Sequence, residues 1–514
     1  MKRRPRRSGA PAEPSAGAPL PAARSRLDAV LEWAAPLVAL VLVVRLAGFA
    51  TGARLTSDEC FHAWMSEWIA AHGTLPTVVE GLYGGFKYFY PPLLHLVGAA
   101  AVKLFGAPAF REVNVALLAG LFAAVWFALS RTVSRAAAAL AVLALAAYPG
   151  LVQQGVRMYV ECLSAALAAG ATLALLATER EPTRGRAALL GALAGLGVLA
   201  KQSGLLMLPV LGALAALALW RRRRAHAAAF ALALAVACAL AAPFWARNAV
   251  LFGSPVYPVF GRDLDPRLLE LNVRGFTPGW RRFFAGALAD AGWVVPALLA
   301  AGLAVAAAAR RTFAHLLLAG GALLLALAPR VPMLDSRHVI PLVAALVVLA
   351  AVTVAGALGR AAAPRRLLLA ALLAVAGWGA VATPDLRERL NLGGWMDETW
   401  SAIRANVPED GTILCIQTYD TFYYTGRNAT WPIPWGQPDP PVEMFDAKSA
   451  AAVLAALRRH RIGWLLVPTE ARGTAFNSAN FPIGFMRGLQ ELSDQGRVDL
   501  VWGRRELALL RVRE

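Results

Sequence analysis

The chain has 514 residues, of which 58% are hydrophobic and only 16% charged, and its formal net charge is +19. A soluble protein carries about a quarter charged residues, so this composition excludes a disordered chain, a collagen and an ordinary cytosolic enzyme. The four cysteines are scattered and form no paired metal motif. The excess of Lys and Arg lies in short clusters between long apolar runs, as in the cytoplasmic loops of membrane proteins. The sequence therefore predicts a polytopic α-helical membrane protein that binds no nucleic acid.

The chain opens with a basic segment, residues 1–27, which is rich in proline, alanine and serine. We expect it to be a disordered cytoplasmic tail. The first apolar run, residues 29–50, is long enough to remain as a membrane anchor. With the runs that follow it, the chain is expected to cross the membrane about 11 times. The later runs lie at 113–129, 136–153, 163–178, 187–200, 203–220, 226–246, 289–309, 313–329, 338–358 and 367–382.

The segment 91–106 is ambiguous, because it is short, opens with two prolines and contains His95 and Lys103. If it does not cross, all the arginine clusters between later runs face the cytoplasm together with the basic N-terminus. If it crosses, they all face outward, against the positive-inside rule. We therefore expect a re-entrant or interfacial helix here, with the loops 51–112 and 247–288 on the outer face.

Residues 385–514 differ from the rest in having only short apolar runs. Those at 412–416, 464–467, 498–502 and 507–510 have strand length, and residues 447–461 have the spacing of an amphipathic helix. Glycines separate these segments. We expect a small α/β domain outside the membrane. The predicted division is a tail at 1–27, a membrane domain at 28–384 with its first outer loop at 51–112, and the α/β domain at 385–514.

The densest group of reactive side chains follows the first membrane run. Asp58 and Glu59 are adjacent carboxylates near a membrane surface, where carboxylates are costly to desolvate and mark a candidate functional site. In a helix, Asp58 and His62 would share a face; a solvated loop start is the alternative. A further acid, Glu161, lies four positions after Arg157, so that one helical turn would pair them.

Cationic residues gather on the same, outer side of the predicted topology. Lys201 is flanked by apolar sequence, so its ammonium either has an anionic partner or extends to the interface. Several cations beside carboxylates indicate an anionic ligand, and phosphate suits the geometry of arginine. The cations on this side are Lys87, Arg111, Lys201, Arg247, Arg330 and Arg337.

A carboxylate base beside cations fits the transfer of a group from a phosphate-linked donor. The base takes a proton from an acceptor hydroxyl, and the cations stabilise the charge on the departing phosphate. At a membrane interface the donor would be a lipid phosphate. Cys60 and Cys162 each adjoin one of the acidic residues, and we favour unpaired, packed thiols over a disulfide between them.

A series of short motifs follows in order along residues 55–345. The motifs are Asp58-Glu59, His72–Pro76, Tyr90–Leu93 with Leu104–Gly106, Arg111, Arg157–Glu161, Gly195-Leu196 with Lys201, Arg247-Asn248 with Phe252–Pro258, and Arg337-His338 with Pro341. Their order and spacing resemble those of the GT-C-fold glycosyltransferases, the superfamily of the dolichyl-phosphate-mannose protein mannosyltransferases and the bacterial aminoarabinose transferases.

The resemblance implies a GT-C fold with a periplasmic α/β tail domain, in the inner membrane of a bacterium. It implies transfer of a sugar from a polyprenyl-phosphate carrier to a lipid A, glycan or protein hydroxyl at the periplasmic face, usually with inversion. By position, Asp58 is then the base, Glu59 its companion and Glu161 the second acid. The implied contacts of the carrier phosphate or the sugar are Lys87, Tyr90, Arg111, Arg157, Lys201, Arg247 and Arg337. Tyr90 stands where the two branches have Lys or His before the proline pair.

Three alternatives stay open at this point. Asp58, His62 and Glu161 are candidate ligands of a divalent metal, which some GT-C enzymes use and others lack, so no cofactor is assigned. A transporter or flippase of a lipid-linked or anionic substrate would need charges through the depth of several helices, whereas these gather on one side. A non-catalytic membrane subunit would not need the acid and cations together. For the tail domain we expect a role in binding or positioning the acceptor.

Overall fold

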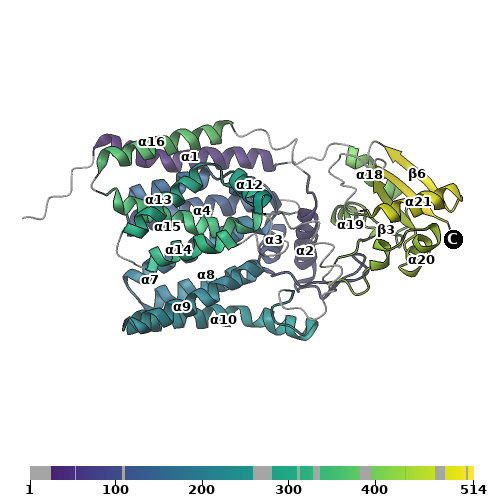
Figure 1. Cartoon of the computed structure of the whole chain (residues 1–514), viewed down its shortest axis with the longest axis horizontal. Coiled ribbons are helices and arrows are strands. Elements are labelled where there is room, and N and C mark those ends of the chain that lie inside the picture. Colours follow the sequence, from purple (N-terminus) through teal and green to yellow (C-terminus); the bar gives the residue numbers. More distant parts are fainter. Residues whose placement is uncertain are drawn as a thin grey trace, which may run out of the picture.

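A bundle of helices and a small sheet domain lie end to end, with helices α2 (Asp58–His72) and α3 (Leu93–Phe105) between them (Figure 1). The computed structural model describes residues 25–51, 54–106, 110–258, 280–308, 313–327, 336–359, 361–382, 395–433, 436–468, 481–504 and 507–513. Most of the predicted N-terminal tail, residues 1–24, lies outside these ranges. From Arg26 onward the chain is helical, because Ser25 and Asp28 form a capping box at the start of α1.

A helix forms at each of the apolar runs. These helices are α1 (Arg26–Ala50), α4 (Phe110–Thr132), α5 (Arg135–Ala146), α7 (Val160–Arg180), α8 (Arg184–Ala200), α9 (Met207–Trp220), α10 (Arg224–Phe252), α13 (Val294–Ala308), α14 (Phe313–Leu327), α15 (Ile340–Ala357) and α16 (Ala362–Ala382). Short helices α6 (Pro149–Gln154), η1 (Gln202–Leu206), α12 (Trp280–Ala291) and η3 (Ser336–Val339) join or precede some of them.

Fewer helices reach spanning length than the 11 crossings expected. In the described ranges seven are long and apolar enough to cross a membrane, or eight if the bent pair α12–α13 counts as one. The remaining runs form α5, α8 and α14, with 12, 17 and 15 residues, below the ~20 residues of a straight crossing. The chain is a multi-pass membrane protein with several shortened helices. Helix α3 has 13 residues and is about 20 Å long, and its re-entrant or interfacial placement stays a prediction.

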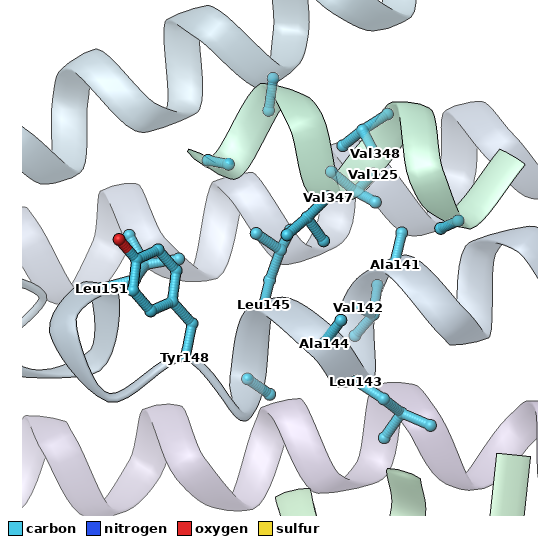
Figure 2. Packing of buried hydrophobic residues seen from close by; sticks show 14 of the residues in the cluster. Val125, Ala141, Val142, Leu143, Ala144, Leu145, Tyr148, Leu151, Val347 and Val348 are labelled. Carbon is cyan, nitrogen blue, oxygen red and sulfur yellow. The ribbon is translucent and has the colours of Figure 1, made fainter. Parts of the chain in front are cut away.

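Helix α5 forms the centre of the bundle, in contact with α1, α4, α15 and α16. Its Ala and Leu side chains are buried on every face, and Figure 2 shows Leu145 beside Val347 of α15 and, further along, Val125 of α4. Elsewhere in the bundle α8 and α10 approach closely: a Cβ at Gly191 would collide with the backbone of α10, and one at Gly195 would be in very tight contact with it. Small residues at this spacing are typical of tight packing between membrane helices, and the contact fixes the end of α8 that leads to Lys201.

The C-terminal part is the α/β domain expected from the sequence. Its sheet has the order β4-β3-β5-β7-β6, in which β3 is parallel to β4 and β5, and β7 is antiparallel to β5 and β6. The strands are β3 (Thr412–Leu414), β4 (Asn428–Thr430), β5 (Trp464–Pro468), β6 (Val498–Arg504) and β7 (Leu507–Val512), and the helices are α18 (Trp395–Asn406), α19 (Thr418–Thr425), α20 (Ala450–Arg459) and α21 (Ile483–Asp494). The predicted boundary at 384/385 falls in 383–394, outside the described residues.

The sheet domain is docked on the segment between α1 and α4, which is called the first outer loop after its predicted side. This loop contains a small hairpin, β1 (Val78–Val79) with β2 (Phe86–Lys87). Leu82 beside the hairpin forms a parallel bridge to Ala429 of β4, and the amide of Lys87 donates to the carbonyl of Gly436 at 2.7 Å. The loop therefore connects the helical bundle to the sheet domain.

Candidate active site

A pocket of about 170 Å³ opens where the first outer loop meets the ends of α7, α8 and η3. It brings together side chains that are far apart in the sequence. The lining residues are Asp58, His62, Tyr90, Pro91, Leu94, His95, Tyr159, Val160, Glu161, Ala200, Lys201, Gln202, Arg337 and His338.

Asp58 is the first residue of α2, so its position in the first helical turn is favourable for a carboxylate. Its side chain is 35% exposed, and its Oδ2 lies 3.1 Å from Nη2 of Arg337. The guanidinium of Arg337 also lies 5.1 Å from the ring centroid of Tyr159. Helix α2 confirms the predicted shared face of Asp58 and His62, and both residues line the pocket.

Glu161 and Lys201 form the second ion pair of the pocket. Glu161 is 3% exposed, in the first turn of α7, and its Oε1 lies 2.8 Å from Nζ of Lys201. Lys201 thus has the anionic partner that a poorly solvated ammonium requires. The predicted pairing of Glu161 with Arg157 is wrong, because α7 begins only at Val160 and the two residues do not share a helical turn. Arg157 lies over the ring of Tyr159 instead.

Glu59 and Arg111 are also paired, but away from the pocket. Both are buried, and Nε and Nη2 of Arg111 donate to the two carboxylate oxygens at 2.9 and 2.8 Å. Glu59 Oε1 accepts a further hydrogen bond from the amide of Met158 at 2.9 Å. The pair joins the start of α2 to α4 and to the segment before α7.

Of the other sequence-predicted cations, Lys87, Arg157 and Arg247 do not line the pocket either, and Arg330 lies outside the described residues. Lys87 is exposed on β2. Arg247 donates to the carbonyl oxygens of Pro76 at 2.7 Å and Tyr88 at 2.9 Å, and so ties the first outer loop to α10. Of the predicted contacts, Tyr90, Lys201 and Arg337 line the pocket.

A buried chain of three hydrogen-bonded side chains extends from the pocket wall. Nδ1 of His62 is 2.7 Å from Nε2 of His95, and Nδ1 of His95 is 2.6 Å from Oη of Tyr88. Burial lowers the pKa of the His62 imidazole to about 4, so the ring is neutral at physiological pH. Sequence reasoning missed this chain. Its signals in the sequence were His62, close to the two adjacent acids, and His95, a histidine inside a short apolar segment.

The three candidate metal ligands face one pocket, but their partners do not suit a cation. Asp58 and Glu161 each bind a cationic side chain, and the His62 ring bonds to His95. In the described part of the chain, no cluster of three His, Cys, Asp or Glu side chains could hold a metal ion. Cys60 and Cys162 are both buried and unpaired, as favoured from the sequence.

The family model of the dolichyl-phosphate-mannose-protein mannosyltransferases matches residues 90–246, which include Tyr90, Glu161 and Lys201 of the pocket. Among solved structures, ArnT from Cupriavidus metallidurans bound to undecaprenyl phosphate matches with a TM-score of 0.58 and 16% identity, over 94% of this chain and 97% of that chain. The chain is a multi-pass membrane protein with the GT-C fold.

The oligosaccharyltransferase of Archaeoglobus fulgidus has the same fold. It matches with a TM-score of 0.63 and 14% identity, over 86% of this chain and 69% of that chain. No curated protein sequence matches the chain.

Proposed function

We propose that the chain transfers a sugar from a polyprenyl-phosphate carrier to a hydroxyl group of a lipid, glycan or protein, with inversion at the anomeric carbon. The observation that carries the proposal is a single pocket in which the Asp58 carboxylate lies with two cations, Lys201 and Arg337. A base for the acceptor and positive charge for the departing phosphate are the two requirements of this reaction. The undecaprenyl phosphate bound to the ArnT structure supports the choice of carrier.

In the proposed reaction, Asp58 accepts the proton of the acceptor hydroxyl while that oxygen attacks the anomeric carbon of the donor sugar. The bond from the anomeric carbon to the phosphate oxygen breaks, and its electron pair leaves with polyprenyl phosphate. Attack from the side opposite the leaving group inverts the configuration. The carrier gains one negative charge, which the cations of the pocket stabilise.

Before the donor arrives, the ion pair with Arg337, at 3.1 Å, occupies the carboxylate of Asp58. A donor phosphate in the pocket offers the guanidinium a second anion. Arg337 then shifts its hydrogen bonds toward the phosphate, which frees the Asp58 carboxylate to accept the proton of the acceptor hydroxyl. In this mechanism the base acts only when the donor is bound.

Glu161 holds Lys201 at the pocket wall, where the ammonium also faces the donor phosphate. Tyr90 and Tyr159 also line the pocket, and we assign them to contacts with the sugar. Glu59 and Arg111, in contrast, fix the start of α2 from behind. Lys87, Arg157 and Arg247 do not line the pocket, and of these Arg247 holds the first outer loop through the carbonyl oxygens of Pro76 and Tyr88.

We place the pocket on the outer, periplasmic face of a bacterial cytoplasmic membrane, with the N-terminus in the cytoplasm, because the arginine-rich connections then lie inside. Single cysteines replacing Glu80 and Arg184, both exposed, test this in a Cys238→Ala background, since the other native cysteines are buried. A membrane-impermeant maleimide should label position 80 in intact cells and position 184 only after lysis. The opposite pattern would contradict the proposed sidedness.

The reaction itself is tested with purified protein and a polyprenyl-phosphate sugar carrying carbon-13 at the anomeric carbon. Transfer to an envelope lipid or glycan extract should release polyprenyl phosphate and give a product of inverted configuration by NMR. A retained configuration would refute the direct displacement. Movement of the intact sugar lipid across vesicles, without bond cleavage, would instead indicate a transporter. Mass spectrometry of envelope lipids and glycans, with and without the gene, identifies the acceptor.

A further inference from the structure

The sheet domain reaches the candidate active site through one helix, α19. Its aromatic side chains pack on α2, with ring centroids 5.0 Å apart for Phe61 and Tyr419 and 5.3 Å apart for Trp64 and Phe422. The hydroxyl of Tyr424 donates to the carbonyl of Leu55 at 2.7 Å. This docking brings a buried carboxylate of α19 against the residue that precedes Asp58.

That carboxylate belongs to Asp420, which is 5% exposed. The amide of Ser57 donates to both of its oxygens, at 2.9 Å to Oδ1 and 3.0 Å to Oδ2. Across the interface, Sγ of Cys60 lies 3.8 Å from Oδ1. Burial raises the pKa of Asp420 to about 6, so the carboxylate is mostly ionised at neutral pH despite its surroundings.

Ser57 has an unusual backbone conformation, with φ 54° and ψ −126°. Residues with a Cβ rarely adopt a positive φ, and such conformations persist only where neighbouring groups impose them. In this position the Ser57 amide is directed at Asp420, and Asp58 then starts α2. Through this hydrogen bond, Asp420 of the sheet domain stabilises the turn at Ser57.

The residue on the other side of Asp58 is fixed as well. Glu59 is held by two hydrogen bonds from Arg111 and one from the amide of Met158. Asp58 therefore lies between one neighbour held by the helical bundle and another held by the sheet domain. Of Ser57, Asp58 and Glu59, only Asp58 lines the pocket.

We propose that Asp420 is a positioning residue, through which the sheet domain sets the orientation of Asp58. The role of Asp58 as base is part of the proposed function, and this inference rests on it. If the base is displaced by a fraction of an ångström, the rate of transfer falls, because the carboxylate must lie within hydrogen-bond distance of the acceptor hydroxyl to take its proton. The sheet domain is then part of the catalytic unit and not only a module that binds the acceptor.

The central test compares Asp420→Asn with Asp499→Asn. Asp499 is an acid of β6 that pairs with Arg511 and Arg513 of the same domain, so it controls for loss of a tail carboxylate. We expect Asp420→Asn to lower kcat about tenfold or more, with KM for the polyprenyl-phosphate sugar nearly unchanged. Asp499→Asn should behave as wild type. An unchanged kcat for Asp420→Asn, or a loss confined to KM, would overturn the proposal.

A second variant separates positioning from general damage to the fold. Glycine adopts a positive φ without the steric penalty of a Cβ, so Ser57→Gly should restore part of the kcat lost in Asp420→Asn. If the double variant is no faster than Asp420→Asn, the strained turn is not the reason for the loss, and the proposal fails.

A third measurement does not depend on transfer. Hydrogen exchange at the Ser57 amide should be about tenfold faster or more in Asp420→Asn than in wild type or Asp499→Asn. If wild type shows no transfer, the proposed function fails, while this exchange result still tests the contact. Equal exchange in all three proteins would show that Asp420 does not hold the turn.

Discussion

Asp58 and Arg337 form an ion pair at 3.1 Å although 279 positions separate them in the sequence. The pair joins the first outer loop to η3, at the opposite end of the membrane domain's sequence. The pocket therefore forms only when these two distant parts of the sequence are folded together.

Replacing Arg337 by Met should lower kcat by about 10²-fold or more, because the cation that stabilises the departing phosphate is lost. The rate is measured as release of polyprenyl phosphate from a labelled donor. Arg184→Met, at an exposed position on α8, is the control and should keep full activity. An Arg337→Met protein with normal turnover would remove this residue from the mechanism.

Removing Lys201 should cost stability as well as activity. In Lys201→Met the carboxylate of Glu161, 3% exposed, stays buried without its partner, which destabilises a protein by about 3–5 kcal/mol. The double variant Glu161→Gln/Lys201→Met removes both charges and should recover most of the thermal stability in detergent. It should stay inactive, since the ammonium is still missing. A stable single variant would contradict the buried pair.

The pair Glu59–Arg111 should behave differently. Arg111→Met should be strongly destabilising, by about 3–5 kcal/mol, and Glu59→Gln in addition should restore much of the loss. Because Arg111 does not line the pocket, the folded double variant should bind the donor with an unchanged KM. A KM about tenfold higher in a well-folded double variant would instead indicate a phosphate contact, as the family resemblance implies.

His62 gives the pH dependence of stability. Its pKa is lowered by burial from 6.5 to about 4 in the folded protein. The folded state therefore binds this proton less readily than the unfolded state. The neutral His62 therefore makes its full contribution to the free energy of unfolding above pH 6.5. That contribution, about 3 kcal/mol, is lost as the pH drops toward 4. Thermal unfolding of wild type and His62→Gln from pH 4 to 8 measures the difference. The loss at low pH should be smaller in the variant, and equal curves would contradict a buried neutral histidine.

Much of the fold could be predicted from the sequence, because apolar runs and strand-length segments are local patterns. The length of each helix was less predictable: α5 has only 12 residues, since Tyr148 and Pro149 start a new element after it. Strand β4 was missed, because three residues beginning with Asn carry little strand signal. Its place in the sheet depends on pairing with β3.

The site was predictable in its residue types and less so in its pairings. Asp58, Glu161 and Lys201 were identified because charges beside apolar runs are unusual. The pairing of Glu161 with Lys201 was not predicted, because the two residues are distant in sequence and meet only through the packing of α7 against α8. Asp420 carried no signal at all: it is one carboxylate in a polar domain, and its burial follows from the docking of α19 on α2.

The most direct test of the account is sugar transfer by Asp58→Asn. Asn keeps the size of the side chain but cannot accept the acceptor's proton, and loss of a general base lowers the rate about 10²–10⁴-fold. Glu80→Gln, at an exposed position of the same outer loop, serves as the matched control. We expect Asp58→Asn to accumulate to the wild-type level and release almost no polyprenyl phosphate, while Glu80→Gln turns over normally. Turnover by Asp58→Asn at the wild-type rate would contradict the central claim.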